Sequence, residues 1–507
     1  MFMEKLRQTL NEDFNVSITE NGAIGYRTSG TALVDINFAI TSLRNKSERE
    51  IVDKFVKAFY EDKMLAMKWL FYARDVREGV GERRLFRACM EYLAKNHVEI
   101  AKAVIPLIPI YGRYDDWFCL MNTELEDFVI KEIKEQLAED MEFMAEGKPI
   151  SLLAKWMPSA NTSSKATREL ARKIIRKLEI TERQYRKMLA KLRDYLKVVE
   201  VSMSKNEWKA IDYSAVPSRA NLIYNSAFLR NDEARRRDFL ARLEKGETKI
   251  NAGVLFPHDI VHKYVAGCGR SLSLKSKDTA IEELWKALPD FVKGDANTIC
   301  VSDGSGSMTV KVGGTTISAL EVAISLSIYF AERCKGQFKD KYITFSNRPQ
   351  LVDFSRANSL REKIEIALRY SEVASTNIEA VFDLILETAI QNKMTQAEIP
   401  ARILILSDME FNYSVSNCNA RLFKVFEDRY AAAGYKLPRI IFWNINSRTG
   451  TIPMKTNELG VALVSGFSPA VVNTVFSNAR DPYECLVEQL NAERYDAVEA
   501  ALIDICK

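Results

Sequence analysis

The sequence predicts two folded parts, an all-helical N-terminal part and a C-terminal α/β part. Its 507 residues exceed the roughly 250 to 300 at which one hydrophobic core stops growing. Apolar residues recur at helical spacing from about residue 46 to 265, whereas strand-like runs alternate with helical stretches after residue 295. Between the two patterns lies a segment rich in Gly, Ser and Lys. We therefore expect a helical-repeat domain at 1–266, a linker and connecting helix at 267–294, and an α/β domain at 295–507.

The helical part is a series of amphipathic stretches with little loop between them. They lie at 46–62, 65–76, 82–95, 98–108 and 115–121. Consecutive amphipathic helices without a sharp sequence repeat predict an irregular α-solenoid of the HEAT or armadillo type. A large globular helical bundle fits the same pattern.

The α/β part alternates strands with helices. Strands are expected at 297–302, 340–346, 402–407, 438–446 and 460–465, and helices at 317–334, 377–390, 418–433 and 469–478. This alternation predicts a doubly wound parallel sheet covered by helices. Because such sheets bind ligands at the carboxyl ends of their strands, a functional site is expected at that edge.

The composition indicates a cytoplasmic protein. Lys and Arg number 72 against 68 Asp and Glu, and the eight cysteines are far apart. No CxxC motif occurs, which argues against a disulfide scaffold and a zinc site and favours a reducing compartment. No run of about 18 apolar residues is present, and the N-terminal residues carry charges where a signal peptide needs an apolar core. We expect a soluble protein that does not enter a membrane.

Oxygen-bearing side chains follow three of the strand regions. Asp303, Ser305 and Ser307 lie in VSDGSGSMT, directly after the first predicted strand. Thr376 precedes a predicted helix, and Asp408 is the first acid after the strand ARILILS. Glycines are expected to let the first loop turn so that both serines face one point. Short oxygen ligands that converge at one sheet edge suit a hard cation such as Mg²⁺. An ordinary Ser/Gly turn is the alternative.

This order of residues resembles the metal-ion-dependent adhesion site of von Willebrand factor A domains. The resemblance covers about 295–507. It implies that Ser305, Ser307 and Thr376 bind the ion directly, that Asp303 and Asp408 act partly through water, and that a partner's carboxylate or phosphate fills an open position. Asn377 departs from the family pattern, which often has an acid there. A fold that kept the sequence and lost the ion is the alternative.

Positive charge is concentrated in one window of the helical part. Residues 151–250 contain 23 Lys and Arg against 12 Asp and Glu. Two successive predicted helices carry basic residues on one side and apolar residues on the other. Thr181 and Gln184 form a predicted capping box at the start of the second helix. The basic positions are Lys165, Arg168, Arg172, Lys173, Arg176, Lys177, Arg183, Arg186 and Lys187. Because few acids are interspersed, an RNA backbone along these helices is the preferred explanation, and a solvated helix face is the alternative.

The whole chain also resembles the Ro ribonucleoproteins and a related family that ends in a von Willebrand A domain. The resemblance to their TROVE module is carried by ARDVREGVGERRLFRACMEYL, IPIYGRYDDWFCL, LLAKWMPS, YRKMLAKLRDYLKVVE and LFPHDIVHKY. It implies a monomeric ring of helical repeats that takes single-stranded RNA ends in a basic hole and structured non-coding RNA outside. Because they lie in the resembling segments, Lys155 and His258 are expected to contact RNA in addition to the basic helices.

Two other functions remain open from the sequence. The chain is expected to be non-enzymatic, because residues 295–507 contain no histidine and no activated nucleophile. A metal-dependent scaffold that holds acidic protein partners, without RNA, is the first alternative. A hydrolase is the second, because HDIVH (258–262) imitates the HExxH zinc motif. The imitation is poor, because Asp259 is too short for the usual base and no third ligand is evident.

Overall fold

The structure, a computed structural model, forms two compact units that interleave along the chain. It describes residues 3, 14–19, 24–268, 271–292, 297–371, 377–410, 420–448, 450–453, 461–471 and 481–506. The first unit, called here the sheet unit, comprises residues 1–69, 78–80 and 252–493. The second, the helical unit, comprises residues 70–77, 81–251 and 494–507. These units differ from the expected domains, because the described residues of 1–69 and of 252–292 belong to the same unit as the sheet.

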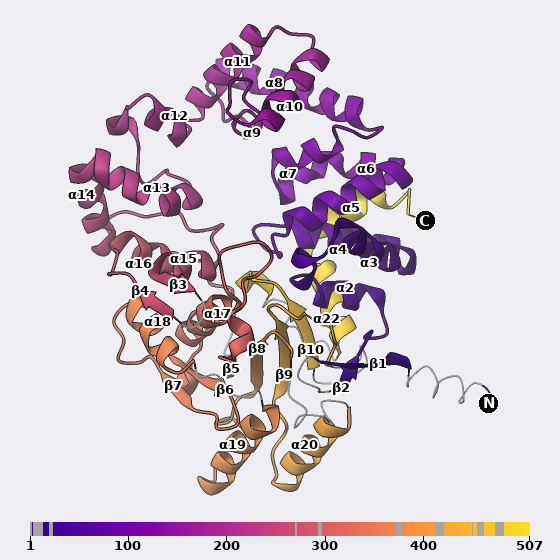
Figure 1. Ribbon diagram of the computed structural model, residues 1–507, viewed down its shortest axis with the longest axis vertical. Helices are drawn as coiled ribbons and strands as arrows, with labels where there is room; N and C mark the ends of the chain where they lie inside the picture. Colours follow the sequence, from indigo (N-terminus) through magenta and orange to yellow (C-terminus); the bar gives the residue numbers. More distant parts are fainter. Residues whose placement is uncertain are drawn as a thin grey trace. The chain divides into compact units, whose positions relative to one another are not determined.

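A mixed sheet of six strands forms the core of the sheet unit (Figure 1). Its strands are β5 (Thr298–Asp303), β6 (Lys341–Phe345), β7 (Leu351–Asp353), β8 (Arg402–Ser407), β9 (Arg439–Asn444) and β10 (Val461–Ser465). They lie in the order β10-β9-β8-β5-β6-β7. All neighbours are parallel except β6 and β7, so the short edge strand corrects the all-parallel expectation. The connection reverses direction between β5 and β8, which makes their carboxyl ends a topological switch point.

Helices cover the sheet because most residues of its strands are apolar. Every residue of β5 and β10 is buried, as expected for parallel strands that are covered on both faces. Helix α17 packs against β5, β6 and β8, α19 packs against β6, and α18 packs on α17 and α16. The bounds are α16 (Thr279–Lys286), η5 (Gly306–Thr309), α17 (Ala319–Arg333), η6 (Gly336–Phe338), α18 (Leu360–Arg369), α19 (Ile378–Gln391), α20 (Ala420–Ala432), η8 (Pro469–Val471) and α22 (Pro482–Leu490). The 3-10 helix η9 (Glu493–Tyr495) begins at the last residue of the sheet unit, and its other two residues belong to the helical unit.

Segments from outside the predicted α/β domain complete the sheet unit. They are β1 (Val16–Ile18), β2 (Ile24–Tyr26), α2 (Ala32–Phe38), η1 (Ser42–Asn45), α3 (Glu48–Glu61), the first half of α4 (Lys63–Arg74), α15 (Pro257–Tyr264), β3 (Val265–Cys268) and β4 (Ser271–Leu274). Helix α2 packs on β10, and α15 packs on α17. The segment expected to be a linker contains β4, which pairs antiparallel with β3. Backbone pairing outweighs the flexible composition of GCGRSLSLKSKD there.

The helical unit is built from short helices that pack mainly on their neighbours in sequence. They are α5 (Arg83–Asn96), α6 (Val98–Val104), η2 (Ile105–Leu107), α7 (Ile108–Tyr111), η3 (Tyr114–Leu120), α8 (Glu126–Ala145), α9 (Leu153–Trp156), α10 (Lys165–Lys177), α11 (Glu182–Tyr195), α12 (Val199–Ser204), η4 (Trp208–Ala210), α13 (Ser218–Asn231), α14 (Glu233–Glu244) and α23 (Asp496–Leu502). Contacts join α5 with α6, α10 with α11, and α13 with α14. The chain is therefore helical followed by α/β, as the sequence predicts at the coarse level.

Two local features differ from the expected elements. Residues 114–120 form a 3-10 helix, where an amphipathic α-helix is expected at 115–121. The helix expected at 469–478 begins as the short 3-10 helix η8, and its remainder lies outside the described residues.

Among the described residues, none of the helices has both the length and the apolar character that crossing a bilayer demands.

Candidate metal centre and basic helical face

The switch point of the sheet brings together four of the five predicted metal residues. Asp303 is the last residue of β5, and Asp408 directly follows β8, the neighbouring strand. Ser305 and Ser307 lie in the loop and short 3-10 helix that follow β5. Because the two parallel strands end at the same edge, the sheet itself holds both carboxylates in place. The fifth residue, Thr376, lies outside the described residues.

Hydrogen bonds hold the loop after β5 in a compact turn. The Asp303 carboxylate accepts a bond from the Ser305 backbone N–H at 2.9 Å. The Ser305 and Ser307 hydroxyl oxygens are 2.8 Å apart. Ser407, the last residue of β8, donates its hydroxyl to Asp303 at 2.6 Å and so joins the two strand ends. The two serines of the loop therefore face each other above a carboxylate that is fixed from two sides.

Asp408 is the least satisfied group at this edge. Its side chain is 2% exposed, and its Oδ2 atom has no hydrogen-bond partner among the described residues. Arg448 Nη2 lies 3.7 Å away, which is an ion-pair distance and too long for a hydrogen bond. Burial and the neighbouring Asp303 carboxylate raise the pKa of Asp408 to about 7, although hydrogen bonds from the Ser307 hydroxyl and from the Glu410 backbone N–H to the carboxylate oppose this. Burial also raises the pKa of Asp303, although the bonds from Ser407 and Ser305 oppose this.

The donor set fits a divalent cation. Two buried carboxylates that are both ionised repel each other, so the charged forms are unfavourable unless a positive charge lies between them. An orphaned carboxylate oxygen and two facing hydroxyls are hard oxygen ligands of the kind that Mg²⁺ prefers. Within the described residues, no group of three or more His, Cys, Asp or Glu is arranged to hold an ion. The fit therefore depends on hydroxyl ligands beside two carboxylates.

The backbone at the site differs from what the glycines suggest. Neither Gly304 nor Gly306 adopts a positive φ, so the loop turns without the left-handed conformation that only glycine enters easily. The unusual residue is Met409, whose φ is +62° and whose side chain is buried. Such a conformation costs a non-glycine residue about 1 kcal/mol or more. The chain therefore turns sharply just after Asp408.

Two polar residues of the site are not found by sequence reasoning. Ser407 binds Asp303, and the buried carboxylate of Glu410 accepts the Arg448 backbone N–H at 2.9 Å. The adjacent letters SDME could have indicated Ser407, because it immediately precedes a predicted ligand at a strand end.

Asn377, which departs from the family pattern, caps α19 by accepting the Ala380 N–H at 3.2 Å.

The basic face of the helical unit lies on α10 and α11. Thr181 and Gln184 form the capping box that the sequence predicts at the start of α11. Tyr185, Leu189 and Leu192 are buried on its opposite side. Six basic side chains are exposed and, among the described residues, make no hydrogen bond or ion pair: Arg172, Arg176, Arg183, Arg186, Lys187 and Lys191. This set is called the basic face below.

Other predicted RNA contacts on α10 have partners within the chain. Lys173 binds Glu126 at 2.5 Å, and Lys177 binds Asp127 at 2.6 Å, so helix α8 neutralises this side of α10. Arg168 donates to the backbone carbonyls of Thr162 and Ser163, at 2.6 and 2.7 Å. Lys165 has only a loose pair, 3.8 Å from Glu169 on the same helix. The uncompensated charge is smaller than the sequence suggests, because the acids come from another helix.

Lys155 and His258 do not join the basic face. Lys155 is half-buried beside the ring of Trp156. His258 is 5% exposed and packs between the rings of Phe256 and Phe467 in the sheet unit. The expected contact of His258 with RNA is therefore corrected, since its ring is covered by aromatic side chains.

The two histidines of HDIVH have separate surroundings. The His262 ring nitrogens bind Glu321 Oε1 at 2.7 Å and the Thr316 hydroxyl at 3.0 Å. Those contacts tie α15 to the start of α17. Since His258 packs between aromatic rings instead, the described contacts give each histidine of the motif a structural role.

Two family models match the chain, and they divide it between residues 295 and 297. The model "Domain of unknown function (DUF2828)" matches residues 19–108 and 125–295. The chain belongs to the DUF2828 family. The model "Domain of unknown function (DUF7788)" matches residues 297–500. The chain is also similar to "Uncharacterized protein L728" of Acanthamoeba polyphaga mimivirus, with 32% identity over 503 residues that cover 91% of this chain and 85% of the relative. The likeness to TROVE and von Willebrand A domains stays a prediction.

Proposed function

We propose that the protein binds an anionic group of a partner through a divalent cation at the ends of β5 and β8. The observation that carries this proposal is the buried Asp408 Oδ2 atom, which has no hydrogen-bond partner within the described part of the chain and lies beside the second buried carboxylate, that of Asp303. A cation there would relieve the repulsion between the two groups. The strand order, with its switch point at this edge, supports the resemblance to von Willebrand A domains.

Ser305 and Ser307 would bind the ion directly, and Asp303 and Asp408 would act partly through water. The resemblance to von Willebrand A domains implies that Thr376 is a further direct ligand. The two hydroxyls are half-buried, whereas both carboxylates are buried, so the accessible side of the site offers neutral ligands. An ion held mainly by neutral ligands stays electrophilic and supplies an open position for a carboxylate or phosphate. The proposed role is binding, without a catalytic step.

Calorimetric titration of the full chain with MgCl₂ or MnCl₂ tests the metal proposal. We expect saturable binding that weakens at least about tenfold in Asp303→Asn and in the double variant Ser305→Ala/Ser307→Ala. Asp353→Asn, which changes an exposed carboxylate elsewhere in the sheet unit, is the control and should bind as the native chain does. Equal affinity in all four proteins, or no binding by the native chain, would refute the proposal.

RNA binding by the helical unit is a second candidate function. It is favoured by the six unpartnered cations of the basic face, which an RNA backbone would neutralise. The neighbouring helix pairs of the unit are consistent with HEAT-like repeats. Under this proposal, single-stranded ends or structured non-coding RNA would be held electrostatically along α10 and α11.

Filter binding across a salt series tests this second function. The fourfold variant Arg172→Glu/Arg176→Glu/Arg183→Glu/Arg186→Glu should weaken binding of single-stranded RNA more than about tenfold and lower the slope of log K against log salt by about 3. The control reverses four exposed cations of the sheet unit: Arg49, Lys57, Lys339 and Lys436. Binding that ignores salt, or that both variants weaken equally, argues against RNA at this face.

A further inference from the structure

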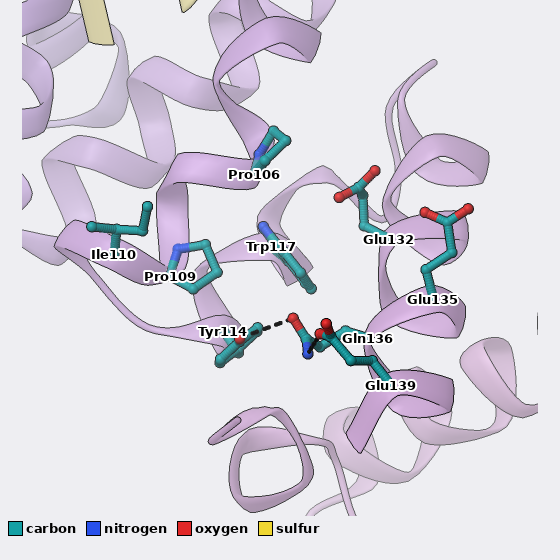
Figure 2. Close-up of a pocket in the computed structure, with 9 residues that line it drawn as sticks. All are labelled: Pro106, Pro109, Ile110, Tyr114, Trp117, Glu132, Glu135, Gln136 and Glu139. Atoms are coloured by element: carbon teal, nitrogen blue, oxygen red, sulfur yellow. Dashed lines mark hydrogen bonds between the residues drawn. The ribbon is translucent and has the colours of Figure 1, made fainter. Parts of the chain in front are cut away.

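The helical unit contains a second surface, of opposite charge to the basic face. It is a groove of about 610 Å³ between the segment η2–α7–η3 and helix α8. Figure 2 shows Pro106, Pro109 and Ile110 on one side and the carboxylates of α8 on the other, with Trp117 between them. This groove is called the acidic groove below.

The apolar wall of the groove is rigid. Pro106 and Pro109 lie in the first turns of η2 and α7, where a proline ring fits without loss of a helix hydrogen bond. Trp117 is buried and donates its indole N–H to the Ile105 carbonyl at 2.9 Å. The Tyr114 ring stands edge-on to it, at 5.1 Å and 87°. Ile110 is 48% exposed at the rim. The wall therefore offers fixed apolar and aromatic surface.

The opposite wall carries negative charge that a nearby lysine compensates only in part. Glu132, Glu135 and Glu139 succeed one another along α8, and no Lys or Arg is among the described residues that line the groove. Burial raises the pKa of Glu132, the charge of Glu135 adds to this, and the charge of Lys131 opposes it. Glu135 has one loose pair, 3.7 Å from the exposed Lys131. Gln136 links the walls, because it donates to Glu139 at 2.7 Å and accepts the Tyr114 hydroxyl at 3.4 Å.

Other acids on helix α8 form ion pairs with lysines. At its first turn, Glu126 and Asp127 are paired with Lys173 and Lys177 of α10. Two turns further on, the acids of the groove face prolines and aromatic rings, and the chain supplies no cation among the residues that line it. A phosphate backbone is repelled by this charge, whereas a lysine or arginine gains both the carboxylates and an aromatic ring. Charge complementarity thus selects a cationic occupant.

We propose that the acidic groove docks a short segment of a partner protein in which a lysine or arginine stands next to an apolar residue. The apolar residue packs on Pro106, Pro109 and Ile110, and the cation lies between the glutamates and Tyr114. The binding surface thereby differs from the candidate metal centre, which takes anions. The helical unit then has one face for polyanions and one groove for basic peptides.

Selection of random heptapeptides displayed on phage, with the full-length chain immobilised, tests this proposal. We expect enrichment of sequences that place Lys or Arg beside Leu, Ile or Pro. A synthetic peptide of the most enriched sequence, labelled with fluorescein, is then titrated by fluorescence anisotropy. Its affinity should fall about tenfold in Glu132→Gln/Glu135→Gln/Glu139→Gln, because three exposed or half-buried carboxylates are lost. Ile110→Asp should weaken it as well.

The control removes three exposed acids elsewhere in the helical unit, Glu179, Glu207 and Glu247, and should leave the affinity unchanged. Unchanged thermal unfolding of each variant shows that the fold is kept. Absence of enrichment, enrichment of acidic or purely apolar peptides, or equal affinity in the groove variant and the control would each overturn the proposal. The mass in solution of the native chain and of the groove variant is also compared by light scattering. If the native chain is a dimer, the groove variant, which lacks the Glu132 charge, is a monomer, and no peptide binds, a second copy of the chain occupies the groove and the proposal is overturned.

Discussion

At the scale of single residues, Asp408 is the group whose surroundings are hardest to explain without a ligand. Glu410, two residues on, and Asp303, at the end of the neighbouring strand β5, are also buried acids, and the Asp408 Oδ2 atom finds no hydrogen bond among the described residues. A carboxyl group whose pKa rises on folding costs stability at every pH above its unfolded value. Removing this one charge should therefore help the protein when no cation is present.

The variant Asp408→Asn should have effects of opposite sign with and without a divalent cation. At pH 8, above the pKa of about 7, and with a chelator, we expect Asp408→Asn to raise the melting temperature of the sheet unit by about 2–4 °C, since a buried like-charge repulsion is lost. With 10 mM MgCl₂, ligand binding stabilises the native chain more than the variant, and the order reverses. Differential scanning calorimetry measures both.

Asp353→Asn, at an exposed position, should leave the melting temperature unchanged under both conditions. If Asp408→Asn destabilises equally with chelator and with Mg²⁺, its carboxylate has a structural role and the metal explanation fails. The common position of Asp303, Ser305, Ser307 and Asp408 at one edge of the sheet was predictable from motif order, because each lies at or just after the end of a recognisable strand. The contribution of Ser407 was not, since its partner Asp303 is 104 residues away.

At the scale of elements, strong hydrophobic periodicity predicted the positions of helices and strands well, whereas local amino-acid composition predicted them poorly. The strands at 298–303 and 402–407 and the helix at 319–333 lie within about one or two residues of their expected bounds. Their long apolar runs are buried whatever the rest of the chain does. The hairpin of β3 and β4 was missed because its sequence is rich in Gly and Ser, and its stability depends on backbone pairing.

The basic helices show a limit of the same kind. Helical periodicity placed their charged and apolar sides correctly, and the cap of α11 followed from Thr181 and Gln184. The partners of Lys173 and Lys177 come from α8, about 50 residues earlier in the chain. A charge count along one window cannot detect such pairs, and it therefore overstates the free positive charge.

At the scale of the whole molecule, the two units are not consecutive in sequence. Thr41, in the N-terminal part, shares a buried hydrogen bond with Ser465 at 2.9 Å, and Asn444 donates to the Phe38 carbonyl at 2.8 Å. In the helical unit, Arg494 from the C-terminal part makes two bonds with buried Asp75, at 2.6 and 3.0 Å. Each unit therefore depends on a segment from the far end of the chain.

A fragment that spans only the expected α/β domain, residues 295–507, should fold poorly. Without residues 1–294, the fragment lacks α2, which packs on β10 and α22 and carries four buried apolar residues, Leu33, Val34, Ile36 and Phe38. The burial of these four side chains is worth more than about 5 kcal/mol. We expect a broad thermal transition and strong binding of an apolar dye, and co-expression with residues 1–294 should restore a sharp one. A fragment that melts alone as cooperatively as the full chain would contradict the division into units.

The sequence by itself determined the two kinds of secondary structure, the strand ends that carry Asp303 and Asp408, and the side of α10 and α11 that bears charge. These features depend on the spacing of apolar residues within some 20 positions, which is written locally in the chain. Only the tertiary structure decided the order of the strands, the pairing of lysines with α8, the burial of His258 and the acidic groove. Those depend on which distant segments meet, because burial and charge are properties of the packed neighbours.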